Sequence, residues 1–134
     1  MGKQILLPPA ERRELRKALG VHEVILGRAL KYERNSARDK RIRAEALKMG
    51  GLIFTGTPAP GDFIPNVKTY YNEGDNTIHQ ALGDRMELVI SKTDSSATLI
   101  IDGETAANFE AVTMTGWGSI LFAMQQVYNQ LSIR

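Results

Sequence analysis

No continuous helix is expected through residues 55–66, because this stretch holds three of the chain's five prolines and two of its twelve glycines. Proline removes a backbone donor and clashes with the preceding helical turn. Before this stretch the apolar residues recur with a period of 3.6, and after it they alternate with a period of 2. We expect an α+β protein with a domain at residues 1–51, a linker at residues 52–66 and a second domain at residues 67–134.

The two parts of the chain also differ in charge. Residues 1–50 hold 13 Lys and Arg against 6 Asp and Glu, a net charge of +7, and residues 51–134 hold 4 against 9, a net charge of −5. This asymmetry is typical of a chain in which one domain meets a polyanion and the other does not. Solvated helix faces rich in arginine would give the same charges, so both interpretations stay open.

Composition excludes several classes of protein. The chain is 43% hydrophobic and 24% charged, which are globular values. No apolar run approaches the roughly 18 residues that a membrane-spanning helix needs, and the apolar start is too short for a signal peptide, so we expect a cytoplasmic protein with no membrane partner. The absence of cysteine and the presence of two histidines exclude disulfides, thiolate zinc sites and histidine-rich metal sites. We therefore expect no cofactor and no metal.

Three short helices are predicted in the first part from apolar residues at helical spacing, over about residues 10–19, 22–32 and 36–49. Ser36 and Asp39 have the spacing of a capping box at the start of the third helix, and Gly50-Gly51 ends it. Residues 52–54 are apolar, and we expect a short strand or an apolar clasp there.

Between the first two helices the sequence is Leu19-Gly20-Val21. Gly20 supplies a sharp turn in or near the left-handed region, where a residue with a Cβ is strained. Leu19 and Val21 flank the glycine as apolar contacts that hold both helices against one core. Such a pair of helices is predicted to form a helix-turn-helix.

The residues of this segment follow a known pattern. Leu15 is an apolar residue of helix one, Gly20-Val21-His22 stands at the turn, and Leu26-Gly27-Arg28-Ala29-Leu30 lies in helix two. Residues 10–51 thereby resemble the helix-turn-helix head of lac-repressor-type bacterial regulators, and residues 36–49, which include Arg41 to Leu47, resemble that family's third helix. The resemblance implies a DNA-binding head. It does not imply an inducer site, because the family's hinge helix and sugar-binding domain have no counterpart here.

The resemblance also implies which residues meet DNA. It places Glu23, Val24 and Arg28 at base edges in the major groove, with Gly27 allowing close approach. Arginine can pair bidentately with guanine, glutamate can accept from cytosine, and valine can touch a thymine methyl, each good pair giving about 1–3 kcal/mol of discrimination. Phosphate contacts are expected from basic residues around this helix: Arg12, Lys17, His22, Lys31, Arg34 and Arg38.

Simpler interpretations of these residues stay open. Glu23 near a helix N-terminus is stabilised by the helix dipole alone, and Arg28 could pair with a neighbouring glutamate on the surface. His22 is more often a turn residue than a phosphate ligand. We interpret Arg41 and Arg43 as part of a solvated helix face.

The second part is predicted to form an antiparallel meander of about five short strands, over residues 67–71, 77–82, 86–91, 97–101 and 104–111. Asp102-Gly103 is a strong signal for a two-residue hairpin turn. A final amphipathic helix follows, with Thr113 or Thr115 as its cap, and packs on one face of the sheet.

Four residues on the apolar side of this helix are expected to be core or dimer contacts rather than a ligand pocket: Trp117, Leu121, Met124 and Tyr128. A dimer is expected because one recognition helix makes few base contacts, whereas two heads on a pseudo-palindrome roughly add their free energies. An exposed sheet edge and an aromatic-rich helix would also need cover.

Little in the sequence predicts catalysis. Asp84, Asp94, Asp102 and Glu104 stand at or beside turns, where acidic residues commonly bind the local backbone. No histidine or lysine is spaced to work with these carboxylates, and His79 is expected to be a half-exposed strand residue. We do not expect an enzyme.

The sequence therefore predicts a sequence-specific DNA-binding protein, a small homodimeric transcriptional regulator that takes double-stranded DNA as its partner. The alternative is a protein-interaction adaptor or antitoxin-like module whose second domain binds another protein. A third hypothesis is a sensor whose small-molecule effector, of unknown identity, lies under the final helix.

Overall fold

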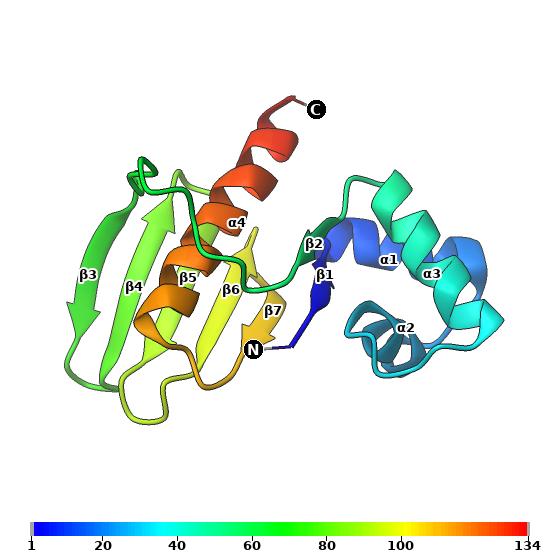
Figure 1. Ribbon diagram of the computed structural model, residues 1–134, viewed down its shortest axis with the longest axis horizontal. Helices are drawn as coiled ribbons and strands as arrows, with labels where there is room; N and C mark the ends of the chain where they lie inside the picture. The colour runs from blue at the N-terminus through cyan, green and yellow to red at the C-terminus, as the bar shows by residue number, and fades with distance from the viewer. Residues whose placement is uncertain (1, 134) are drawn as a thin grey trace. The chain divides into compact units, whose positions relative to one another are not determined.

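The computed structural model describes residues 2–133 (Figure 1). In chain order its elements are β1 (Gln4–Leu6), α1 (Pro9–Leu19), α2 (Glu23–Leu30), α3 (Ala37–Lys48), β2 (Leu52–Phe54), β3 (Lys68–Asn72), β4 (Thr77–Leu82), β5 (Met86–Ser91), β6 (Ala97–Ile101), β7 (Glu104–Phe109) and α4 (Met114–Ile133). The protein is α+β, as predicted. The chain divides into two compact units between Thr55 and Gly56, inside the expected linker, and we call them the basic unit and the acidic unit.

The basic unit places three helices around one small core. The predicted helix spans agree with α1, α2 and α3 to within two residues at each end. Gly20 follows α1 with φ 62° and ψ 36°, the left-handed conformation expected of it, and donates its backbone N–H to the carbonyl of Arg16. The fully buried side chains come from all three helices and from the segment that precedes them: Ile5, Leu7, Leu15, Leu26, Leu30 and Ile42.

A strand near the N-terminus was not predicted. β1 pairs antiparallel with β2, with Gln4 opposite Phe54 and Leu6 opposite Leu52. Residues 52–54 are thus a strand of the basic unit, which corrects their assignment to the linker. Three-residue strands are too short to show a period, and their pairing joins distant parts of the chain.

The third helix begins as predicted. The backbone N–H of Asp39 donates to the hydroxyl of Ser36 at 3.2 Å, and the backbone N–H of Ser36 donates to the Asp39 carboxylate at 3.0 Å, which completes the capping box. The Ser36 hydroxyl also donates to this buried carboxylate at 2.6 Å. That hydrogen bond lowers the pKa of Asp39 and outweighs the opposing effect of burial.

The interpretation of Arg43 as a solvated residue is wrong. Its side chain is 7% exposed and donates to the carbonyl oxygens of Ala29 at 3.0 Å and Arg34 at 2.8 Å, and to the side-chain oxygen of Asn35 at 3.0 Å. Its guanidinium also lies 4.6 Å from the centroid of the Tyr32 ring. Arg43 therefore fixes the loop between α2 and α3, whereas Arg41 is exposed as expected.

The acidic unit is a five-stranded antiparallel meander in the order β3-β4-β5-β6-β7, with α4 crossing one face (Figure 1). All five predicted strands are present, with ends shifted by at most two residues. Asp102 and Gly103 form the predicted turn, with φ values of 52° and 80°. Thr113 accepts from the backbone N–H of Gly116 at 3.0 Å at the start of α4, as expected of a cap.

The four predicted dimer contacts all belong to α4, and the acidic unit itself accounts for them. Leu121 is 8% exposed and Met124 is fully buried. The indole N–H of Trp117 donates to the side-chain oxygen of Gln80 at 2.7 Å, and the Tyr128 ring lies against Gly83. The apolar character of this helix therefore does not require a second chain, and contacts of these residues across a dimer stay a prediction.

Candidate nucleic-acid interface

The outward side of α2 is a row of exposed residues that sit one helical turn apart. Val24 is 52% exposed, and Arg28 and Lys31 follow it at spacings of four and three residues. The opposite side of this helix holds Leu26, Ala29 and Leu30, all fully buried. We call Val24, Arg28 and Lys31 the exposed row. It contains two residues expected at base edges and one expected at a phosphate.

Glu23, another residue expected at a base edge, is held by α1. Its carboxylate lies 2.7 Å from the Arg12 guanidinium and 3.8 Å from that of Arg16. Two residues assigned to DNA, Arg12 and Glu23, are thus brought together as partners that join the two helices. To accept a hydrogen bond from cytosine, the Glu23 carboxylate would have to give up its ion pairs with these arginines, which join α1 to α2.

Gly27 lies beside the same arginine. A Cβ placed on Gly27 would lie 3.7 Å from the terminal nitrogen of Arg12, so the guanidinium passes over this position. That distance is an ordinary van der Waals contact, so the packing of Arg12 does not by itself require glycine here. The sequence pattern assigned this residue to close approach by DNA.

His22 occupies the N-cap position of α2. Its Nδ1 accepts the backbone N–H of Val24 at 3.2 Å, and its backbone is extended, with φ −75° and ψ 152°. The simpler interpretation of His22, as a residue of the turn, describes this contact.

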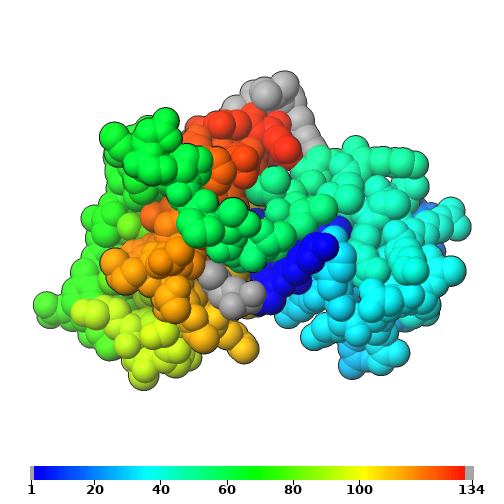
Figure 2. Space-filling model, viewed as in Figure 1, coloured from blue at the N-terminus to red at the C-terminus, as the bar shows by residue number. Residues whose placement is uncertain are grey.

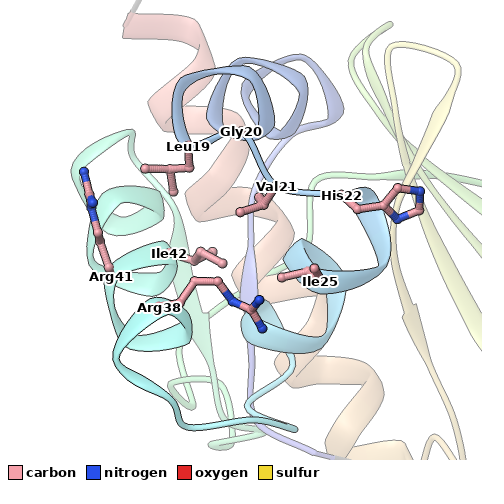
Figure 3. A pocket seen from close by; sticks show the side chains of 8 residues that line it. All are labelled: Leu19, Gly20, Val21, His22, Ile25, Arg38, Arg41 and Ile42. Atoms are coloured by element: carbon pink, nitrogen blue, oxygen red, sulfur yellow. The ribbon is translucent and has the colours of Figure 1, made fainter.

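A hollow of about 490 Å³ opens beside the turn (Figure 3). Leu19, Val21, Ile25 and Ile42 supply apolar walls, and Gly20 contributes backbone. The other three lining residues carry nitrogen-rich side chains: His22, Arg38 and Arg41. Figure 3 shows the guanidinium of Arg38 extending over the hollow and the ring of His22 pointing away from it. Two residues expected at phosphates therefore border one hollow, together with Arg41.

The other expected phosphate contacts are exposed and belong to separate elements. Lys17 lies in the last turn of α1, and Arg34 lies in the loop before α3. The carbonyl of Arg34 accepts from Arg43, so this loop position is held in place while its own side chain is exposed. These cations surround the exposed row in sequence.

A second polar cluster lies on the face of the sheet opposite α4, and sequence analysis missed it. The Tyr70 hydroxyl donates to Glu87 at 2.7 Å, Nδ1 of His79 also contacts Glu87, and Nε2 of His79 lies 2.8 Å from the Thr77 hydroxyl. The Thr77 hydroxyl donates to Asp75 at 2.6 Å. Sequence analysis considered the four carboxylates at turns and not Glu87, to which strand pairing brings His79.

Hydrogen bonding in this cluster shifts two pKa values. The pKa of Tyr70 is raised, chiefly because its hydroxyl donates to Glu87. Burial acts to raise the pKa of Glu87, but hydrogen bonds from Tyr70 and His79 outweigh it and lower the pKa. The Tyr70 and His79 rings stack with centroids 4.6 Å apart. Only the register, with Tyr70 opposite His79, could have revealed the cluster.

Two further searches bear on the class of protein. Within residues 2–133, no helix has the length and apolar character needed to cross a membrane. In the same part of the chain, no group of three or more His, Asp or Glu side chains is arranged to hold a metal ion. Comparison of the chain with models of known families, with curated proteins and with solved structures gives no match.

Proposed function

We propose that the protein is a sequence-specific DNA-binding protein, a small homodimeric transcriptional regulator whose α1–α3 segment is a helix-turn-helix head. The observation that carries the proposal is the exposed row on α2. Val24, Arg28 and Lys31 face solvent while the opposite side of the helix is buried. A helix that is anchored on one side and basic on the other can lie in a major groove.

The distribution of charge supports the proposal. The head carries a net charge of +7 in residues 1–50, and the rest of the chain carries −5. A basic surface attracts the phosphate backbone, whereas the negative charge of the acidic unit repels it. The charges therefore favour DNA binding through the basic unit alone. The resemblance of residues 10–51 to lac-repressor-type heads is independent of this charge and agrees with it.

In the proposed mechanism each residue of the exposed row has one task. Arg28 donates two hydrogen bonds to a guanine, Val24 contacts a thymine methyl, and Lys31 binds a phosphate. The ion pair between Arg12 and Glu23 holds α2 at a fixed angle to α1 before DNA arrives. Because this geometry exists in the free chain, little ordering is needed on binding.

The first experiment measures affinity for random duplex DNA over a range of salt concentrations. Log affinity is expected to fall linearly with log salt, with a slope of about −0.9 for each phosphate neutralised. Absence of binding at low salt would contradict the proposal. A positive slope or a flat line would contradict it equally.

The second experiment tests sequence reading. Sequences bound by the chain are selected from a random pool, and the selection is repeated with Arg28→Ala. The variant is expected to lose about 1–3 kcal/mol of preference at one base pair while keeping its salt slope within one phosphate. Lys48→Ala is the matched control, since Lys48 is an exposed cation of α3 paired with Glu45. Unchanged preference in Arg28→Ala would remove Arg28 from the interface.

The hollow beside the turn favours a second candidate, a peptide-binding protein whose site lies in the basic unit; the adaptor expected from the sequence would bind its partner through the second domain instead. The apolar walls from Leu19, Val21 and Ile25 and the bordering Arg38 and Arg41 suit an acidic peptide with apolar side chains. A peptide-binding protein of this kind would leave random duplex DNA unbound at low salt. The first experiment therefore separates the two functions.

A further inference from the structure

The two edges of the sheet in the acidic unit are built differently. At the β7 edge, Ala106, Ala107 and Phe109 are buried, and the pairing of β6 with β7 shifts register between Leu99 and Ile100. Register shifts and buried side chains are common means of closing an edge to further pairing. At the opposite edge, β3 pairs with β4 in unbroken register along its whole length.

β3 lacks several of the usual protections of an edge strand, and its one charged residue, Lys68, lies at its N-terminal end. All five of its residues, Lys68 to Asn72, are exposed, and the strand contains no proline. The chain that precedes β3 is directed elsewhere, since Phe63 packs edge-on against Phe122 of α4 at 5.1 Å. Figure 2 shows this green segment lying against the orange atoms of α4. An exposed strand of this kind is a template for another strand.

Two tyrosines extend the exposed surface to both faces of β3. Tyr70 is 52% exposed and Tyr71 is 47% exposed, and neighbouring residues of a strand point to opposite faces. Tyr70 stacks one ring face on His79. The hydroxyl of Tyr71 donates to Asn76 at 2.5 Å. Both rings are thus positioned before any partner arrives.

We propose that β3 pairs antiparallel with β3 of a second copy of this chain, about a twofold axis at Tyr70, so that two sheets join into one. An axis perpendicular to the sheet places Tyr70 opposite Tyr70 of the second copy, and Lys68 opposite its Asn72. The two tyrosines then continue the stack that begins at His79. Aromatic pairs directly opposite each other stabilise such a junction.

Charge selects this pairing over others. The N-terminal end of β3 carries Lys68, and its C-terminal end is followed by Glu73 and Asp75 in the turn. Antiparallel pairing sets the cationic end of each copy beside the acidic end of the other, twice over by symmetry. Parallel pairing would set like ends together. The surface therefore fits a second copy of itself.

This junction deepens the proposed function because it says where the dimer forms. The role of the dimer in DNA binding rests on the proposed function, whereas the dimer itself can exist without it. A junction of two five-residue strands is smaller than a standard interface, so its dissociation constant falls at the micromolar end of the range. Two heads bound to adjacent half-sites raise the effective concentration of the strands. The dimer is tested without DNA, so its failure and that of DNA binding are separate results.

The first test uses the absence of cysteine from the chain. Tyr70→Cys places two thiols opposite each other at the axis, where the Cα atoms of paired residues are about 4.5–5.5 Å apart, within reach of a disulfide. The full-length variant is expected to form a covalent dimer under mild oxidation. Thr105→Cys, an exposed position of β7, is the control and is expected to stay monomeric. No crosslink at Tyr70→Cys, or equal crosslinking of both variants, would overturn the proposal.

The second test keeps Tyr70 and exchanges charges. In sedimentation equilibrium, Lys68→Glu and Glu73→Lys are each expected to weaken the dimer by roughly fivefold, and the double exchange is expected to restore it. Glu110→Lys makes the same kind of change beyond β7 and is expected to have no effect. A wild-type chain that stays monomeric at high micromolar concentration, or single exchanges that leave the dimer unchanged, would overturn the proposal.

Discussion

The basic and acidic units use charged residues in different ways. In the basic unit, charged side chains join elements: Arg12 reaches Glu23 across two helices, and Arg43 holds a loop through three oxygen acceptors. In the acidic unit, apolar side chains of the sheet and α4 form the core, and charged side chains join elements at the surface, where Arg85 meets Asp102 between two turns. The comparison shows that surface ion pairs join elements in both units, and that the basic unit adds a buried cation, Arg43, which holds a loop.

The largest effect is expected from the apolar core of the acidic unit. Met124→Ala should lower the free energy of unfolding of this unit by about 2–5 kcal/mol, because it removes a fully buried side chain and leaves a cavity. The fluorescence of Trp117, the chain's single tryptophan, reports unfolding of this unit during urea titration. Gln126→Ala, on the exposed side of α4, is the control. An unchanged midpoint would contradict the placement of Met124.

Removal of Arg43 tests whether a charged side chain can be equally important in the basic unit. Arg43→Ala should lower the free energy of unfolding of the basic unit by about 2–4 kcal/mol, because the carbonyls of Ala29 and Arg34 lose a charged donor in a buried site. Amide hydrogen exchange in α1–α3 measures the loss, while Trp117 fluorescence should not change. Arg41→Ala, two residues away on α3 and exposed, should have little effect, and equal losses in the two variants would contradict the distinction.

Acid should act on the basic unit through Asp39. Its pKa is lower in the folded chain than the ordinary 3.8, so the stability it contributes is present above 3.8 and is lost as pH falls through the lowered value. Protection of the α3 amides should decline in that range. In Asp39→Asn the decline should be absent, and an identical acid profile for both proteins would contradict this role.

The smallest effect is expected from the ion pair that joins α1 to α2. A double-mutant cycle with Arg12→Ala and Glu23→Ala should give a coupling energy of about 0.2–1 kcal/mol, since the Glu23 carboxylate is 46% exposed. Rising salt should reduce this coupling. A coupling energy of zero at low salt would mean that Arg12 and Glu23 act independently. Both side chains could then contact DNA without loss of a stabilising ion pair.

Much of the fold could be predicted because local signals are strong in this chain. Ser36 and Asp39 form the expected capping box, and Asp102-Gly103 forms the expected turn. Each signal acts through hydrogen bonds or backbone sterics within a few residues, so no distant partner is needed. The candidate interface was harder to predict. The helical period placed Val24 and Arg28 on one side of α2, but it could not show that Arg12 forms an ion pair with Glu23.

Local signals along the chain were enough to predict all the helices and the strands from β2 onward, the turn at Gly20, the hairpin turn at Asp102-Gly103 and the separation of charge between the two halves. Packing of distant segments was needed to show that Arg43 is buried, that β1 joins β2, that His79 meets Glu87 and that β3 is left open at an edge. Period and turn chemistry act along the chain, whereas the burial of an arginine or the exposure of an edge depends on which distant segments pack beside it.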